Sequence, residues 1–169
     1  MADGSGGTGG ARRLNLFVLA VGKAGQSPEA ELCGRYMERA ERIGRSLGLS
    51  AVTVREFAEA TGPTKAALEG DKLLQAKKPG PLVVLDENGA PWSSAEFAAR
   101  LQSWLDAGHP NVCFAIGGAD GHGEAIKAAA DHTMSLSAMT LPHLLARAIL
   151  LEQLYRAVTI RLGHPYHRA

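Results

Sequence analysis

Hydrophobic residues along the chain fall into short continuous runs separated by longer stretches with helical spacing. Continuous runs occupy residues 14–21 (LNLFVLAV), 82–85 (LVVL) and 111–116 (NVCFAI), as is typical of strands buried on both faces of a parallel sheet. A shorter apolar run covers residues 133–136. Residues 51–57 alternate only in part, which favours a strand nearer the edge of the sheet.

The stretches between these runs have the spacing of amphipathic helices. Ser27 and Ser93 are residue types that commonly cap a helix, and each stands just before such a stretch. Alternating strands and helices imply an α/β domain whose mostly parallel sheet is covered on both faces. The predicted helices cover residues 28–47, 65–77, 94–107 and 124–130.

The last helix is predicted from Pro142 to Leu162, with proline at its first position. Its apolar band is wider than a surface helix needs, so the helix is either central to the core or partly buried by a second subunit. We therefore expect an obligate homodimer through this helix. His143 and Arg147 share one of its faces, and Glu152 and Arg156 have the spacing of an intrahelical ion pair.

Three of the predicted strands end in loops that could form a site. Leu85 leads into DENG, Ile116 into GGADGHG, and Leu136 into SAMTL. Ligands of open parallel sheets lie at the carboxyl ends of the strands. We therefore expect these three loops to line one pocket.

The loops match no standard phosphate-binding motif. GGADGHG is neither GxGxxG nor GxxxxGK[ST], so its glycines either let the backbone approach a ligand or serve a tight turn. SAMTL carries no charge, and its backbone N–H and C=O groups would suit the edge of a flat heterocycle such as adenine. GxSxG is absent and no catalytic serine triad or Cys–His pair is evident, which weakens a hydrolase interpretation.

Composition places the chain among ordinary globular proteins. It has 169 residues, 46% hydrophobic and 21% charged, which fits one domain over residues 13–169. Residues 1–12 are a Gly-rich leader that we expect to be disordered. This leader lacks the apolar region of a signal peptide, and no apolar run approaches the ~18–20 residues of a membrane span. We expect a cytoplasmic protein with no membrane association.

The other candidate reactive or charged groups are the two cysteines and the residues near the C-terminus. Cys33 and Cys113 lie far apart in predicted helix and strand, so we expect buried free thiols and no metal site. The net charge is only +1, but the chain from Arg147 onward is rich in arginine and histidine. Such an end is either a phosphate footprint or a solvated tail. Its terminal HPYHR could supply a proton acceptor and a stacking ring.

These segments together resemble a known family. GG-x-x-G after an apolar strand, SLSAMTLPH, R-x-x-x-x-E-Q-L-Y-R-A and the terminal HPYHR are similar to the bacterial 23S ribosomal RNA pseudouridine-N3 methyltransferases. That family belongs to the SPOUT class of enzymes that use S-adenosyl-L-methionine. The resemblance runs from about Arg13 to the C-terminus. One departure is Ala119–Asp120, where many members carry Pro–Glu.

The resemblance implies a Rossmann-like parallel-sheet domain with a C-terminal trefoil knot, a homodimer, and a substrate pseudouridine in 23S rRNA of the assembled ribosome. A methyltransferase of this fold with another substrate, or a non-catalytic RNA-binding factor, are the alternatives. The positions that the resemblance assigns to the cofactor are Leu85, Gly117, Leu136, Ser137, Ala138, Met139, Thr140 and Leu141.

We expect the C-terminal tail to act on the reacting base. Methylation at N3 requires loss of its proton, and histidine is the usual proton acceptor near neutral pH. The candidates in the tail are His164, Tyr166 and His167, and the supporting candidates on the last helix are Arg147 and His143. Arg147, Arg156 and Arg168 are the candidates for RNA binding.

Overall fold

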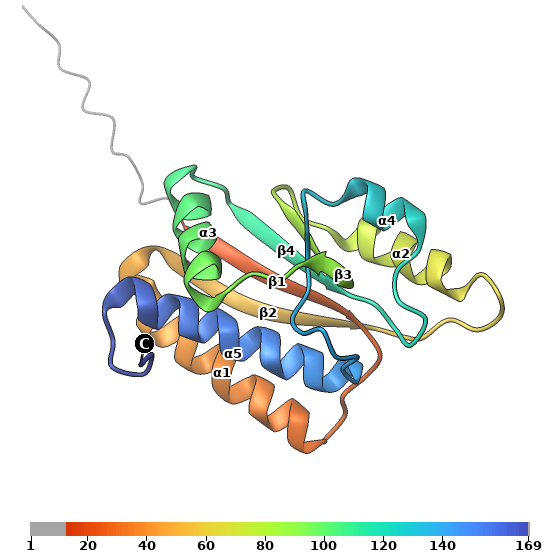
Figure 1. The fold of residues 1–169 in the computed structure, drawn as a ribbon, viewed down its shortest axis with the longest axis horizontal. Helices are drawn as coiled ribbons and strands as arrows, with labels where there is room; N and C mark the ends of the chain where they lie inside the picture. The colour runs from red at the N-terminus through yellow and green to blue at the C-terminus, as the bar shows by residue number, and fades with distance from the viewer. Residues whose placement is uncertain (1–12, 169) are drawn as a thin grey trace, which may run out of the picture.

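The computed structural model describes residues 13–168; the predicted leader, residues 1–12, lies outside the described residues. The strands are β1 Leu14–Val21, β2 Leu49–Phe57, β3 Leu82–Ala90, β4 Asn111–Ile116 and β5 His132–Met134 (Figure 1). The helices are α1 Pro28–Gly44, α2 Lys65–Ala76, α3 Ser94–Asp106, α4 Glu124–Ala129 and α5 His143–Leu162, with a short 3-10 helix, η1, at Arg45–Leu47.

All five strands form one parallel sheet in the order β2-β1-β4-β3-β5. β1 is paired on both sides, and its Leu16 is aligned with Val52 of β2 and with Val112 of β4. β2 is an edge strand, which confirms the prediction from its partial alternation. Because every strand runs the same way, the carboxyl ends of β3, β4 and β5 lie at one end of the sheet.

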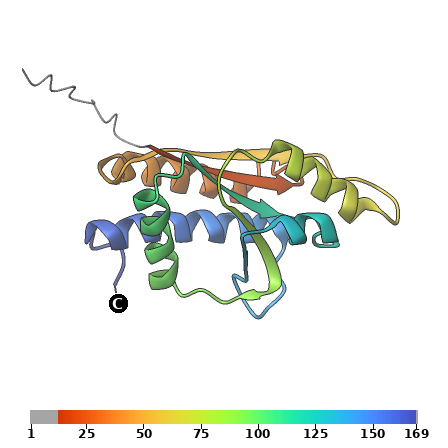
Figure 2. The ribbon, with the colours of Figure 1, turned by 90° about the horizontal axis from the view of Figure 1, so that it is seen from above.

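Helices cover both faces of this sheet, as the alternating pattern predicts. Side chains of α1, α3 and α5 form one hydrophobic core with one face, and α2 and α4 pack on the other (Figure 2). In β1, Val18 and Ala20 point into the first core, and Leu19 and Val21 point into the second. Cys33 and Cys113 are buried free thiols, as expected.

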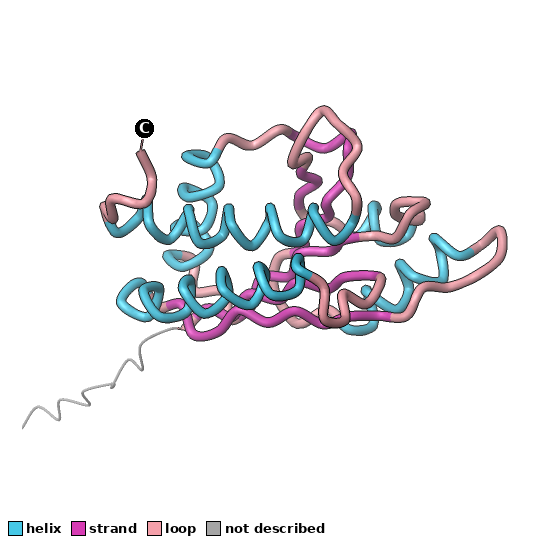
Figure 3. Tube along the Cα trace, turned by 90° about the horizontal axis from the view of Figure 1, so that it is seen from below, coloured by secondary structure: helices cyan, strands magenta, loops and turns pink. Residues whose placement is uncertain are grey.

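Helix α5 lies across the first core, beside α1 and against α3 (Figure 3). Its wide apolar band is therefore largely accounted for within one subunit: Leu150, Leu151 and Leu154 are at most 1% exposed. Of the two sequence-based explanations for this band, the central position in the core is confirmed. A second subunit is not needed to bury most of it.

Among the element boundaries that differ from the sequence-based prediction, three lie near the carboxyl ends of the strands. β3 continues through the expected DENG turn to Ala90, with an irregular register after Leu85, because Ala90 pairs with Met134 far along the chain. β5 is shifted to His132–Met134. Helix α5 begins at His143, since Pro142 is its N-cap, with an extended ψ of 141°.

The β3–β5 contact is an unusually close crossing of two chain segments. Met134 is paired with both Leu85 and Ala90, and Ser135 N–H donates to the Ala90 carbonyl at 3.0 Å. A Cβ at Gly89 would lie 2.6 Å from the Met134 backbone. Only glycine therefore fits at this point, and the segment between Leu85 and Ala90 passes around Met134.

Candidate active site

A cavity of about 730 Å³ opens at the carboxyl ends of β3, β4 and β5. This volume is in the range of small-molecule and cofactor sites. All three loops selected from the sequence line it, so the prediction that they share one pocket is confirmed. The wall is formed mainly by residues 85–88, 116–122, 134–137 and 139–143, with Lys127 and Ala146.

The glycine-rich loop forms the wall after β4. Gly121 N–H donates to the Gly118 carbonyl at 3.0 Å, and these two residues form an isolated bridge that folds the loop tightly. A Cβ at Gly117 would lie 2.7 Å from the Gly121 carbonyl oxygen. Gly117 is thus required for the tight turn, and it also lines the cavity.

The SAMTL turn forms the wall after β5. Met139 N–H donates to Ser137 Oγ at 2.9 Å, and Ser135 Oγ–H donates to the Ser137 carbonyl at 2.9 Å. Among the candidate cofactor residues in this turn, Ala138 is the one that does not line the cavity. The turn is joined to β3 across the cavity through Thr140 and Glu87, whose side-chain oxygens are 3.5 Å apart.

Three polar residues of the cavity were not selected from the sequence. Asp86 and Lys127 form an ion pair at 3.1 Å. The Asn88 N–H, and then Lys127, hold the pKa of the Asp86 carboxyl below its ordinary value, so it is ionised near neutral pH. His122 is 8% exposed, and burial lowers its pKa. Asp86 and His122 belong to two of the loops that were expected to line the pocket, but neither was selected individually. Lys127 comes from α4, which no sequence pattern connected to the site.

Arg147 is buried under the first turns of α5 and is not part of the cavity wall. It is 2% exposed; its Nη1 pairs with Glu56 Oε1 at 2.5 Å, and its Nη2 donates to the Gly22 carbonyl at 3.0 Å. The Ala24 N–H, assisted by Arg147, holds the pKa of Glu56 below its ordinary value. Arg147 therefore ties β1, β2 and α5 together directly behind the cavity.

We expect Arg147→Lys to lower the free energy of unfolding by about 1–3 kcal/mol, because lysine cannot donate to Glu56 and Gly22 together. Urea denaturation at pH 7 measures this free energy.

The same pair should make stability depend on pH. Because the pKa of Glu56 is lowered, the stabilisation by the Arg147–Glu56 pair is present above the ordinary carboxyl pKa and is lost as the pH falls through the lowered value. The stabilities of variant and wild type should therefore converge in acid. Arg35→Lys, in an exposed i,i+4 pair with Glu31, is the control and should change little.

His143 is the one supporting candidate that reaches the cavity. It lines the wall at the first position of α5. A Cβ placed at Gly22 would lie 2.8 Å from His143 Nε2 and 3.4 Å from a carboxylate oxygen of Glu59. The imidazole therefore lies between the cavity and the end of β1, one helical turn before Arg147.

The C-terminal tail packs back on its own subunit, but at the far end of α5. The Tyr166 ring packs against Tyr155 in a tilted arrangement with ring centroids 4.6 Å apart, and its hydroxyl donates to Glu152 Oε1 at 3.0 Å. Burial, with Tyr36 and Glu152, raises the pKa of the Tyr166 phenol, so it is a hydrogen-bond donor rather than a base. The expected Glu152–Arg156 ion pair is confirmed at 2.6 Å.

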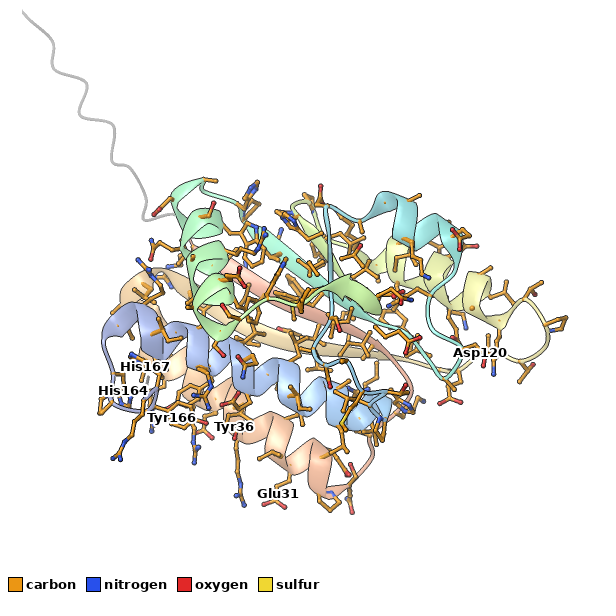
Figure 4. All side chains as sticks on the ribbon, in the orientation of Figure 1. Glu31, Tyr36, Asp120, His164, Tyr166 and His167 are labelled. Carbon is orange, nitrogen blue, oxygen red and sulfur yellow. The ribbon has the colours of Figure 1, made fainter. Side chains whose placement is uncertain are left out.

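The tail lies far from the cavity of its own subunit. Figure 4 shows His164, Tyr166 and His167 at one end of the molecule and Asp120, in the cavity loop, at the other. At 1.5 Å per residue, the helix from Ala146 to Leu162 is ~24 Å long. The five residues from Leu162 to His167 span at most ~18 Å when fully extended. The structure therefore separates the tail candidates from the cofactor candidates within one chain.

Comparison with known proteins identifies the family. The family model described as "Predicted SPOUT methyltransferase" matches residues 14–167. The chain belongs to the SPOUT methyltransferases. It is 46% identical to "Ribosomal RNA large subunit methyltransferase H" of Methylobacterium nodulans, over 92% of this chain and 98% of that protein. It is 47% identical to the protein of the same name from Methylocella silvestris, over 92% and 99% of the two chains.

A solved structure supports the same fold. The crystal structure of a probable methyltransferase from Bordetella pertussis Tohama I matches with a TM-score of 0.52 and 16% identity, covering 88% of this chain and 96% of that chain. This likeness concerns the fold alone. The resemblance stated from the sequence motifs is thus confirmed for the SPOUT family.

Within residues 13–168, no group of three or more His, Cys, Asp or Glu side chains is arranged to hold a metal ion. In the same part of the chain, no helix combines the length and the apolar character needed to cross a membrane.

Proposed function

We propose that this SPOUT protein transfers a methyl group from S-adenosyl-L-methionine to N3 of a pseudouridine in 23S rRNA of the assembled ribosome. The observation that carries this proposal is the 46% identity, over nearly the whole chain, to a large-subunit rRNA methyltransferase. The intact cavity at the strand ends supports an enzyme over a non-catalytic RNA-binding factor. A ribosomal substrate would place the protein in the cytoplasm.

The cavity fits the cofactor in size and chemistry. Its walls at Gly117 and at the SAMTL turn carry no charged side chain, which suits an adenine edge. When bound, S-adenosyl-L-methionine supplies an electrophilic methyl group on a sulfonium. The residues proposed to hold it are Leu85, Gly117, Leu136, Ser137, Met139, Thr140 and Leu141, with Ala138 contributing to the shape of the turn.

The remaining task of the protein is to position the base and to accept the N3 proton. We assign proton acceptance to His164 or His167. Tyr166, which stays protonated, would exchange its hydrogen bond to Glu152 for one donated to a carbonyl oxygen of the base as charge develops there. Because the tail lies far from the cavity of its own chain, it would act on that of a partner subunit. His143 lines the cavity and would support the base, while Arg147 holds the elements behind it.

A homodimer is therefore part of the proposal, and so is the trefoil knot. The passage of the Leu85–Ala90 segment around Met134 supports a knotted chain. Leu32 of α1 and Leu145 of α5 are 39% and 42% exposed near the same end of two neighbouring helices. Exposed leucines on adjacent helices are a suitable centre for a twofold interface.

We expect Leu145→Glu to convert the dimer to a monomer at micromolar concentration, because a charge at the centre of an apolar interface is strongly unfavourable. Light scattering measures the mass. Leu68→Glu is the matched control, since Leu68 is 48% exposed on α2, on the opposite face of the sheet. If wild type is an active monomer under these conditions, the dimer is wrong.

The RNA-binding surface would lie beside the tail. Arg156 stands 5.1 Å from the Tyr166 ring, and Arg168 follows the tail histidines. Arg147 is too deeply buried to contact a phosphate, so its proposed contribution is to positioning. With a net charge of only +1, the protein should recognise folded ribosomal RNA rather than bind naked RNA tightly.

The experiment that tests the function is transfer of radiolabelled methyl groups to ribosomes from cells that lack the enzyme. Mass spectrometry of 23S rRNA digests should find one new N3-methylpseudouridine. Labelling of small molecules or proteins in place of rRNA would favour the alternative of another substrate. Cofactor binding measured by calorimetry, without transfer to any of these acceptors, would favour the non-catalytic alternative.

A further inference from the structure

His122 occupies an unusual place for a polar residue. The bridge between Gly118 and Gly121 folds the loop so that Asp120 is exposed and His122 turns inward, with only 8% of its surface accessible. Its Nε2 is buried and has no hydrogen-bond partner within the described residues. A buried polar group without a partner destabilises the folded state relative to an apolar group of the same shape.

The surroundings of His122 favour a neutral ring with hydrogen-bonding capacity to spare. The charged groups that face it are Asp86 from β3 and Lys127 from α4, and these two already form an ion pair with each other. Burial lowers the pKa of the imidazole, so at neutral pH it carries one N–H donor and one acceptor nitrogen. Neither neighbouring charge uses the buried Nε2.

The ring also lies beside the position assigned to the cofactor. His122 lines the same cavity as Gly117, and a Cβ at Gly117 would be 3.3 Å from the His122 Cε1. A ligand seated against the Gly117 backbone would therefore lie next to the imidazole edge. The Ala115 and Leu85 backbones also lie beside the ring, but no described residue forms a hydrogen bond with Nε2.

We propose that His122 is a cofactor-binding residue whose imidazole hydrogen-bonds the bound S-adenosyl cofactor. The proposal rests on the function proposed above and adds a polar side chain to the wall that the glycine-rich loop forms. A bond to the cofactor would explain why a histidine is buried here, although a leucine at the same position would destabilise the folded protein less. The bond would involve a part of the cofactor that is unchanged by methyl transfer, so substrate and product forms would share it.

The test compares His122→Leu with His122→Gln. Calorimetry at pH 7.5 gives the affinities for S-adenosylmethionine and S-adenosylhomocysteine, and thermal unfolding without ligand gives the stability. We expect His122→Leu to weaken both affinities by about 3–10-fold, the range of one net hydrogen bond. The same variant should unfold at an equal or higher temperature than wild type, because leucine needs no partner. His122→Gln, which keeps a donor and an acceptor, should recover most of the affinity.

His109→Leu, outside the cavity, is the control and should leave both affinities unchanged. The proposal is overturned if His122→Leu binds both ligands as wild type does, or if it loses affinity together with stability, as a structural residue would. Loss of affinity for S-adenosylmethionine alone would also overturn it, since that would indicate a charge effect. Wild-type protein that binds neither ligand would instead overturn the proposed function.

Discussion

Removal of residues 163–169 is expected to lower methyl transfer to ribosomes by at least ~10²-fold, the usual cost of losing a general base. Affinity for S-adenosylmethionine should change far less, because the tail is distant from the cavity of its own chain. The helix α5 would still end at Leu162. Single-turnover rates and calorimetry separate the two effects.

A variant of full length is the control for misfolding or instability of the truncated protein. Combined His164→Ala, Tyr166→Phe and His167→Ala substitutions remove the proposed proton acceptors and donor and leave the backbone in place. This variant should lose activity to a similar degree. Near-wild-type transfer by either protein would mean that the tail is structural and that the base lies elsewhere.

Complementation between subunits tests whether the tail acts on the cavity of its partner. A tail-deleted chain keeps its cavity, and a Gly117→Val chain keeps its tail, so each alone should be inactive. In a random mixture half of the dimers contain one of each, and a tail acting on the partner would restore one site in each of these. About one quarter of the wild-type sites should then be active. If no activity returns, the tail does not act on the partner's cavity.

Gly117→Val is expected to abolish detectable binding of S-adenosylmethionine. Even a single Cβ at this position would approach the Gly121 carbonyl oxygen to 2.7 Å. The branched side chain would therefore both open the Gly118–Gly121 turn and occupy the cavity where backbone should meet ligand. Calorimetry measures the loss, and circular dichroism with thermal unfolding establishes that the variant is folded.

Gly34→Ala is the matched control for this substitution. Gly34 lies in α1, and a Cβ there meets nothing within 4 Å. Alanine should stabilise the helix slightly and leave cofactor binding unchanged. A folded Gly117→Val protein with wild-type affinity would show that the cofactor does not lie against this loop.

Much of the site was predictable from sequence because it is built on a regular rule. Parallel strands bring their carboxyl ends to one edge, so the loops after Leu85, Ile116 and Leu136 were expected at the same edge of the sheet. The adjacency of β4, β3 and β5 then brings these loops together. The cavity confirms this. The unusual composition of SLSAMTLPH and of the terminal HPYHR added the family, which the comparisons confirm.

The positions of individual polar side chains could not be predicted in the same way. Arg147 was expected on a functional face, but its partner Glu56 is 91 residues earlier in the chain, so nothing in the helix pattern indicated that the guanidinium is buried. The sequence shows His122 only as part of a glycine-rich loop. Its burial follows from the bridge between Gly118 and Gly121, which no sequence pattern predicted. The extension of β3 to Ala90 likewise depended on a partner, Met134, that is distant in sequence.

The sequence by itself thus determined the order of strands and helices, the parallel sheet, the three loops of the site and the family. These depend on local patterns of hydrophobic residues and on short motifs. Only the tertiary structure decided that α5 is buried mainly within its own subunit, that Arg147 stands behind the cavity, and that the tail lies at the opposite end. The reason is physical: burial and reach depend on contacts between residues far apart in the chain, which no local pattern specifies.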